Sequence, residues 1–207
     1  MVESGWLDLH FEASFPQYEA MVRAAGFEAG MTVLDAGAGS GSYLPLLAEL
    51  VGNAGSIAAL DLAEENVEAM RDRLRGRGLG CPVEVFKGSV LKLPFADASF
   101  DGVWCANTLQ YFQPVQWDAI MEEFRRVLKP GGLVAIKEFD NTGLQFGPFA
   151  PVLIWRLLAL LEGSDLLLGA GSLATVEIPH HLRRGGFAEI CYESFVGDFQ
   201  QPLSPVQ

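Results

Sequence analysis

Apolar residues along the chain form two kinds of pattern, and their order predicts an α/β fold. Short continuous apolar runs predict buried strands at residues 31–36, 56–61, 82–87, 100–105 and 133–139. Helically spaced apolar positions predict helices near residues 10–25, 63–75, 117–128, 149–161 and 173–184. Because strands and helices alternate through residue 139, we expect one α/β domain with a doubly wound, mostly parallel sheet.

Local signals predict where several helices begin and end. Ser42 is expected to cap a helix that follows the first strand, with Pro45 in the first turn of that helix. Pro130-Gly131-Gly132 is expected to end a helix and turn the chain into the fifth strand. A run of arginines near the end of the helix predicted at residues 63–75 allows two interpretations. It could form an anion site, or it could complement the negative end of the helix dipole, and the dipole alone is a sufficient explanation. The arginines are Arg71, Arg73, Arg75 and Arg77.

The composition favours a globular protein that acts on small molecules. The chain has 207 residues, half of them hydrophobic, and a formal net charge of −12. This charge repels polyanions, so we expect no nucleic-acid partner. Three separate cysteines predict buried thiols in a reducing compartment, and they form no zinc motif; they are Cys81, Cys105 and Cys191. With no signal peptide or membrane-spanning segment evident, we expect a cytoplasmic protein without a metal.

The most informative segment is Val-Leu-Asp-Ala-Gly-Ala-Gly-Ser-Gly at residues 33–41. An apolar strand that leads into a glycine-rich turn and a helix can offer backbone amides to a ligand, and glycines let the backbone approach that ligand closely. The dinucleotide-binding pattern places a third glycine three residues after Gly39, where this chain has Ser42. The spacing therefore disfavours a dinucleotide, and an ordinary strand-to-helix turn is the alternative.

A carboxylate follows at the end of the second predicted strand. Asp61 lies 22 residues after Gly39, where it can accept hydrogen bonds from both hydroxyls of a ribose. The alternative is that Asp61 caps the next helix, which aspartate also does well. The loop at residues 106–112 should lie beside the same ligand, because ligands bind at the carboxyl ends of parallel strands.

Together with three further motifs, these residues resemble the class I S-adenosylmethionine-dependent methyltransferases, in the broad small-molecule group that includes quinone-biosynthesis enzymes. The further motifs are Gly88–Phe95, Phe100–Trp104 and Leu128–Gly132. The resemblance covers residues 30–140 and implies a Rossmann-like methyltransferase fold with S-adenosyl-L-methionine as cofactor. It says almost nothing about the molecule that is methylated.

The resemblance also implies which residues hold the cofactor. Leu62 would lie against the adenine, the backbone N–H of Val90 would serve a ring nitrogen, and Asn107 would hold the amino group of the methionine part. Relatives usually carry an acidic residue where this chain has Ser89, so the hydrogen bond to the adenine amino group would lack charge assistance. The full expected set is Asp35, Gly37, Ala38, Gly39, Gly41, Asp61, Leu62, Gly88, Ser89, Val90 and Asn107.

The sequence identifies no certain catalytic residue. Methyl transfer from a sulfonium mainly needs an aligned acceptor and the exclusion of water, so an acid–base pair is not required. Glu138, His10 and Tyr111 are candidates for accepting a proton, and each has a structural alternative. Tyr111 and Phe112 would line either the acceptor pocket or the core. Structural roles are expected for Asp101, His180 and His181.

The two ends of the chain are expected to shape the acceptor site. Residues 1–29 would form a helical lid, residues 30–140 the cofactor-binding core, and residues 141–207 cap helices and an edge strand, all within one domain. The family fold usually ends in an antiparallel hairpin. Residues 187–195 can supply one strand, but the remaining twelve residues contain two prolines and leave no room for the last strand. A truncated carboxyl end and an absent hairpin both remain open.

These patterns predict S-adenosylmethionine-dependent methyl transfer to a small, apolar or aromatic acceptor. The predicted helix at residues 149–161 offers an apolar wall for that acceptor, although the same surface suits a homodimer contact or the core. The alternative function is a non-catalytic protein of the same fold that acts as a partner or regulatory subunit. Ser89 and the short carboxyl end favour that alternative, whereas Ser42 disfavours an NAD-dependent oxidoreductase.

Overall fold

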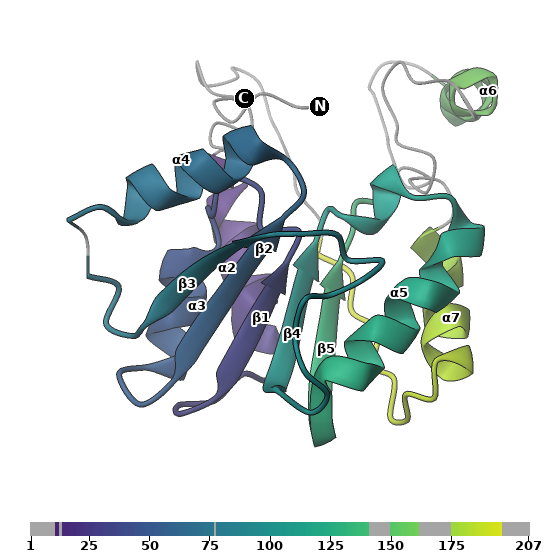
Figure 1. Ribbon diagram of the computed structural model, residues 1–207. Helices are drawn as coiled ribbons and strands as arrows, with labels where there is room; N and C mark the ends of the chain where they lie inside the picture. Colours follow the sequence, from purple (N-terminus) through teal and green to yellow (C-terminus); the bar gives the residue numbers. More distant parts are fainter. Residues whose placement is uncertain (1–10, 13, 77, 141–149, 162–174, 196–207) are drawn as a thin grey trace.

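A five-stranded parallel sheet forms the centre of the computed structural model, which describes residues 11–12, 14–76, 78–140, 150–161 and 175–195. The strand order is β3-β2-β1-β4-β5 (Figure 1). The strands are β1 (Thr32–Ala36), β2 (Ser56–Asp61), β3 (Val83–Lys87), β4 (Phe100–Ala106) and β5 (Leu128–Lys137). The order reverses between β1 and β4, so the carboxyl ends of these strands form the switch point where ligands bind in such sheets. The predicted doubly wound parallel fold is confirmed.

Helices cover both faces of the sheet and enclose two apolar clusters. On one face, the buried side chains of Val33, Ile57 and Trp104 pack against α2 (Phe15–Ala24), α3 (Leu44–Val51) and α4 (Glu64–Leu74). On the other face, Leu34 and Val103 pack against α5 (Pro114–Val127) and α7 (Ile178–Arg184). Figure 1 shows α5 and α7 side by side, with α2 and α3 behind the sheet. The described residues also form α6 (Pro151–Leu161) and two short 3₁₀ helices, η1 (Leu109–Tyr111) and η3 (Thr175–Glu177).

Two of the predicted helix boundaries are wrong. Ser42 does not cap α3, because Tyr43 precedes the first helical residue and its side chain makes no capping hydrogen bond; Pro45 does lie in the first turn. Pro130-Gly131-Gly132 is not a turn between helix and strand but lies within β5. There the pairing of β4 with β5 shifts between Phe100 and Gly102, which is a bulge. A proline and two glycines therefore interrupt the ladder without ending the strand.

The region after α7 also differs from the sequence expectation. Residues 187–195 form no strand and do not pair with β5, so the sheet of the described residues contains no antiparallel strand. Of the three cysteines, Cys105 is buried and Cys81 is partly buried, whereas Cys191 is exposed and contradicts the expectation of a buried thiol. In the described part of the chain, no helix has the length and apolar character needed to cross a bilayer.

Candidate functional site

The glycine turn follows β1 and leads into α3. Gly37, Gly39 and Gly41 have φ angles of 80°, 57° and 80°, values that glycine adopts without strain. The N–H groups of Gly37 and Ala38 donate to the carbonyl of Leu60, at 2.8 and 2.9 Å. The turn is therefore anchored to the end of β2, and its expected ligand-binding residues lie at the switch point of the sheet.

Neighbouring side chains also require glycine in this turn. A Cβ atom at Gly37 would collide with the hydroxyl of Thr108, which belongs to the loop after β4. A Cβ atom at Gly41 would lie 2.8 Å from Leu44 and 2.9 Å from Met70. The sequence analysis attributed these glycines to a ligand, and the structure adds close packing within the protein as an independent cause.

Asp61 connects the glycine turn to the start of α4. One carboxylate oxygen accepts the N–H of Gly39 at 2.8 Å, and the other accepts the N–H of Ala63 at 2.9 Å and Nδ2 of Asn66 at 3.0 Å. Asp61 therefore holds the residue that precedes α4 and one side chain of its first turn, but it does not cap a backbone N–H of that helix. Since two carboxylate oxygens offer about four acceptor positions, these three bonds leave capacity for a hydroxyl, and ribose binding stays a prediction.

Two buried polar groups beneath the turn lack hydrogen-bond partners among the described residues. Asp35, at the fourth position of β1, is only 1% exposed, and its Oδ2 atom has no partner. Burial, followed by the negative charge of Asp61, raises the pKa of Asp35 to about 8. The hydroxyl of Tyr43 is also buried and unpartnered, and burial raises its pKa. Buried groups of this kind are costly unless they are satisfied, which fits a site that receives a polar ligand.

Glu138 organises the loop after β4 from the end of β5. Its Oε1 atom accepts the N–H groups of Thr108 and Leu109, both at 2.7 Å, while its Oε2 atom is buried and has no partner in the described structure. Burial raises the pKa of Glu138, and these backbone donors oppose the rise. One oxygen of Glu138 therefore has a structural role, because it holds the loop, and the other oxygen is left for a ligand or a proton.

The side chains of Asn107 and Lys137 meet beside this loop. Lys137 Nζ donates to Asn107 Oδ1 at 2.6 Å and to the Tyr18 hydroxyl of α2 at 3.3 Å. The carbonyl of Asn107 accepts Nε2 of Gln110 at 2.9 Å. Both oxygens of Asn107 therefore already have protein partners, and its binding of a cofactor amino group stays a prediction. Lys137 was not among the residues predicted from the sequence, although a lysine at the core-facing end of an apolar strand is a signal for it.

The structure describes Tyr111 and its neighbour Phe112 but not His10, the third candidate for accepting a proton. Tyr111 is 56% exposed, and desolvation followed by the charges of Glu138 and Asp61 raises its pKa, so its hydroxyl lies within electrostatic range of both carboxylates. Phe112 is partly buried and packs against the apolar cluster beneath α5, as the core alternative expects, and its place in an acceptor pocket stays a prediction. His10 lies outside the described residues.

On the side expected to hold the adenine, the chain forms a compact turn after β3. Leu62 is 63% exposed, as a residue that contacts a ligand would be. Gly88 donates its N–H to the carbonyl of Asp61 at 2.9 Å, and Val90 is buried. The hydroxyl of Ser89 accepts the N–H of Leu91 at 3.2 Å, so it closes the turn, and a hydrogen bond from Ser89 to adenine stays a prediction.

Two polar groups have structural partners away from this site. Asp101, near the amino ends of the strands, accepts the N–H of Thr32 at 2.9 Å and Nζ of Lys129 at 2.7 Å, and the lysine hydrogen bond is the main cause that lowers its pKa. His181 is buried between α5 and α7, with Nδ1 2.7 Å from a carboxylate oxygen of Asp118. These contacts give both residues packing roles.

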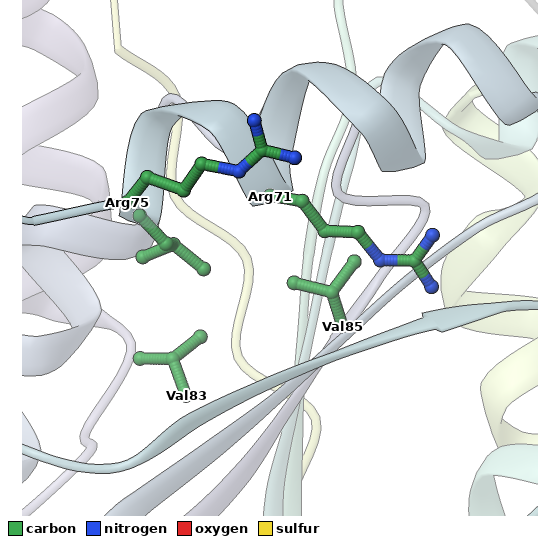
Figure 2. Close-up of a pocket in the computed structure, with 5 residues that line it drawn as sticks. Arg71, Arg75, Val83 and Val85 are labelled. Carbon is green, nitrogen blue, oxygen red and sulfur yellow. The ribbon is translucent and has the colours of Figure 1, made fainter.

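A separate hollow lies between α4 and the edge strand β3. It has a volume of about 390 Å³ and is lined by Arg71, Leu74, Arg75, Val83 and Val85. Figure 2 shows Arg71 on α4 and Arg75 just after the end of the helix, above the two valines of the strand. Arg75 already pairs with Asp72 at 3.0 Å, and the hollow contains neither the glycine turn nor the carboxylates, so it is distinct from the candidate site.

The site as a whole combines an amide-rich turn with several carboxylates and one buried amine. Asp35, Asp61 and Glu138 lie at the ends of β1, β2 and β5, and Lys137 precedes Glu138. Such a set of groups suits a ligand with hydroxyls and positive charge. No three metal-ligating side chains gather anywhere in the described portions of the chain.

Comparisons with known proteins identify relatives of this arrangement. Residues 33–132 match the family described as "Methyltransferase domain". The ubiquinone/menaquinone biosynthesis C-methyltransferase UbiE of Pseudomonas putida is 35% identical over 120 residues, which are 58% of this chain and 46% of that protein. Methyltransferase GfsG of Streptomyces halstedii is 32% identical over 132 residues, 64% of this chain and 46% of its own length. The chain thus spans about half the length of the curated relatives it matches.

Solved structures agree with this match. A SAM-dependent methyltransferase from Aquifex aeolicus is 31% identical, with a TM-score of 0.55 over 71% of this chain and 78% of that one. A SAM-dependent methyltransferase from Thermotoga maritima has a TM-score of 0.62 over 89% of this chain and 74% of that one. At 20% identity, the second likeness concerns the fold alone.

Proposed function

The chain belongs to the class I S-adenosylmethionine-dependent methyltransferases, and from this membership we propose that it transfers a methyl group from S-adenosyl-L-methionine to a small acceptor. The single observation that carries the proposal is the clasp between Asp61 and the glycine turn, with Gly39 N–H 2.8 Å from Asp61 Oδ2. This contact brings the amides after one strand and the carboxylate at the end of the next together at one edge of the sheet, as a nucleoside-bearing ligand requires.

The buried polar groups support a cofactor of this charge. When bound, S-adenosylmethionine supplies a methyl group on a positively charged sulfur together with an amino group, a carboxylate and two ribose hydroxyls. Asp35 Oδ2 is buried without a partner among the described residues, and a cationic ligand would satisfy it. Asp61 keeps acceptor capacity for the ribose hydroxyls, and Leu62 is exposed beside it for the adenine.

The protein's own contribution would be to align the acceptor and exclude water, since a sulfonium already carries a good leaving group. If the acceptor must lose a proton, Glu138 is the better placed described candidate, because its Oε2 atom is free and burial raises its pKa. Tyr111 would then border the acceptor, with its hydroxyl in range of Glu138 and Asp61.

We propose an apolar or aromatic acceptor, and two observations support this class. The relatives named for ubiquinone/menaquinone biosynthesis act, by that name, in the formation of quinones. In this chain, α6 exposes several large apolar side chains, and in Figure 1 it lies beyond the ends to which the strands point. These exposed side chains are Val152, Leu153, Trp155, Leu157 and Leu160. The net charge of −12 makes a nucleic-acid acceptor unfavourable.

Isothermal titration calorimetry with S-adenosylhomocysteine tests the proposal. The wild-type chain and an Asp101→Asn control, altered at the opposite end of the sheet, are expected to bind, whereas Asp61→Ala is expected to bind at least about tenfold more weakly. A transfer assay with labelled S-adenosylmethionine and a panel of hydroquinones, phenols and amines then identifies the acceptor class. A folded wild-type chain that binds no S-adenosylhomocysteine would favour the non-catalytic partner or regulatory subunit instead.

A further inference from the structure

Lys137 places a buried amine at the end of β5. Its side chain is 7% exposed, and Lys137 is the one lysine or arginine of the described residues that is buried. Nζ donates to Asn107 Oδ1 at 2.6 Å and to the Tyr18 hydroxyl at 3.3 Å, and it lies 4.4 Å from the centre of the Tyr18 ring. All three contacts are with neutral groups, and among the described residues Lys137 has no hydrogen bond to a carboxylate, although the charge of the neighbouring Glu138 acts on it.

The fold places this amine on the side of the sheet where the glycine turn enters α3. Lys137 pairs with Ala106 across β4 and β5, at the carboxyl end of both strands. Ala106 belongs to the apolar cluster on one face of the sheet, which also contains Tyr18 and Tyr43. Because successive side chains of β1 point to opposite faces, Asp35 lies on this same face. Lys137 therefore shares one end and one face of the sheet with Asp35.

Charge complementarity leaves one group of the cofactor without a partner. The other ionisable groups of the crevice, Asp35, Asp61 and Glu138, are acids that suit an ammonium, a sulfonium or hydroxyls. The methionine part of S-adenosylmethionine also carries a carboxylate, which needs a cation or N–H donors. A lysine ammonium has three donors, and the hydrogen bonds of Lys137 to Asn107 and Tyr18 occupy two of them.

Resting on the proposed function, we propose that Lys137 is a cofactor-binding residue that holds the carboxylate of the methionine part. Asn107 and Tyr18 orient its ammonium for this role. Because Tyr18 belongs to α2, the same contact makes the N-terminal helix part of the cofactor site. A purely structural alternative is that Lys137 only ties α2 to the loop after β4, and the test must separate the two.

Two ligands that differ only in the carboxylate distinguish a cofactor-binding role of Lys137 from a purely structural one. Calorimetry compares S-adenosylhomocysteine with its decarboxylated analogue on the wild-type chain, Lys137→Met and Lys129→Met. Lys129 is a matched control, because it is an exposed lysine at the other end of β5 that pairs with Asp101. Lys137→Gln, which keeps a polar side chain, replaces the methionine variant if thermal unfolding shows that the latter does not fold.

Lys137→Met is expected to weaken the binding of S-adenosylhomocysteine at least about tenfold, which is the smallest loss expected for one charge-assisted hydrogen bond. The binding of the decarboxylated analogue should stay nearly unchanged. Lys129→Met is expected to change neither. An equal loss on both ligands, or no loss on either, would overturn the assignment while leaving the proposed function intact. Failure of the wild-type chain to bind S-adenosylhomocysteine would remove the proposed function and this assignment with it.

Discussion

At the scale of single residues, Asp61 links the glycine turn, the end of β2 and the start of α4. Replacing it by alanine removes the acceptor for the N–H groups of Gly39 and Ala63. Because a partly buried N–H then loses its bond to a charged group, we expect the free energy of unfolding to fall by about 1–3 kcal/mol. Urea unfolding monitored by tryptophan fluorescence measures this change.

The asparagine variant is the matched control. Asp61→Asn keeps one oxygen of nearly the same position, so it should retain part of these hydrogen bonds and lose less stability than Asp61→Ala. If the alanine variant were as stable as the wild type, the hydrogen bonds of Asp61 would not stabilise the turn, and its carboxylate would serve a ligand alone.

Several residues of the site could be predicted from the sequence because they carry their own chemical signal. Asp61 and the glycines stand out by type and spacing, and the structure brings them together. Lys137 and the contact of Gly37 with Thr108 could not be predicted, because they depend on residues about 30 and 70 positions away that meet only when the sheet forms. The hydrogen bond within the turn at Ser89 could not be predicted for a different reason, since its partner is a backbone N–H only two residues away and the bond depends on the local backbone conformation.

At the scale of elements, Glu138 holds the start of η1. Its Oε1 atom accepts the N–H groups of Thr108 and Leu109, which the short 3₁₀ helix leaves without other partners. Glu138→Ala is expected to destabilise the fold by about 1–3 kcal/mol and to open this loop first. Hydrogen exchange of residues 107–112 should therefore become faster in the variant than exchange in β1.

The glutamine variant at the same position separates geometry from charge. Glu138→Gln retains an acceptor oxygen for the same N–H groups, so the loop should stay protected while any role of the carboxylate as a proton acceptor is lost. Equal protection of the loop in Glu138→Ala and the wild type would contradict the assignment of Glu138 as its organiser.

The docking of α7 on α5 depends on a polar contact inside an apolar interface. Asp118 on α5 lies 2.7 Å from His181 and 2.8 Å from Arg184, both on α7, and the ring of His181 stacks edge-on against Trp117. Asp118→Ala leaves the buried imidazole without this partner, so we expect faster hydrogen exchange in residues 178–184. Asp118→Asn keeps an acceptor oxygen and should have a smaller effect; an equal effect of both variants would show that charge, rather than the hydrogen bond, holds α7.

Strands were easier to predict than element ends. All five strands were predicted, because strands of a parallel sheet covered on both sides read as apolar runs. Helix ends depend on backbone geometry that composition does not specify: α5 begins at Pro114, with Gln113 and Gln116 in a capping box, three residues before its first buried residue Trp117. The Pro-Gly-Gly segment has the composition of a turn, but pairing with β4 makes it a bulge.

At the scale of the whole molecule, the buried acids give folding stability a dependence on pH. Burial raises the pKa of Asp35 from its ordinary value of 3.8 to about 8, and it also raises that of Glu138. Between these limits the folded state binds a proton that the unfolded state has released. The contribution of such an acid to the free energy of unfolding is therefore fully present below about pH 4 and is lost as the pH rises to about 8. Within this window the free energy of unfolding falls by up to about 1.4 kcal/mol per pH unit for each such group.

Asp35→Asn tests this dependence, because an amide is close in shape to a protonated carboxyl and does not titrate. Urea unfolding at several pH values between 5 and 8 should give a shallower decline in the variant than in the wild type. Asp101→Asn is the control, since the pKa of Asp101 is lowered and its titration lies below this window. S-adenosylhomocysteine should reduce the wild-type slope, because its ammonium favours the ionised carboxylate. Identical slopes for wild type and Asp35→Asn would mean that Asp35 is ionised throughout the window and has a partner for its charge.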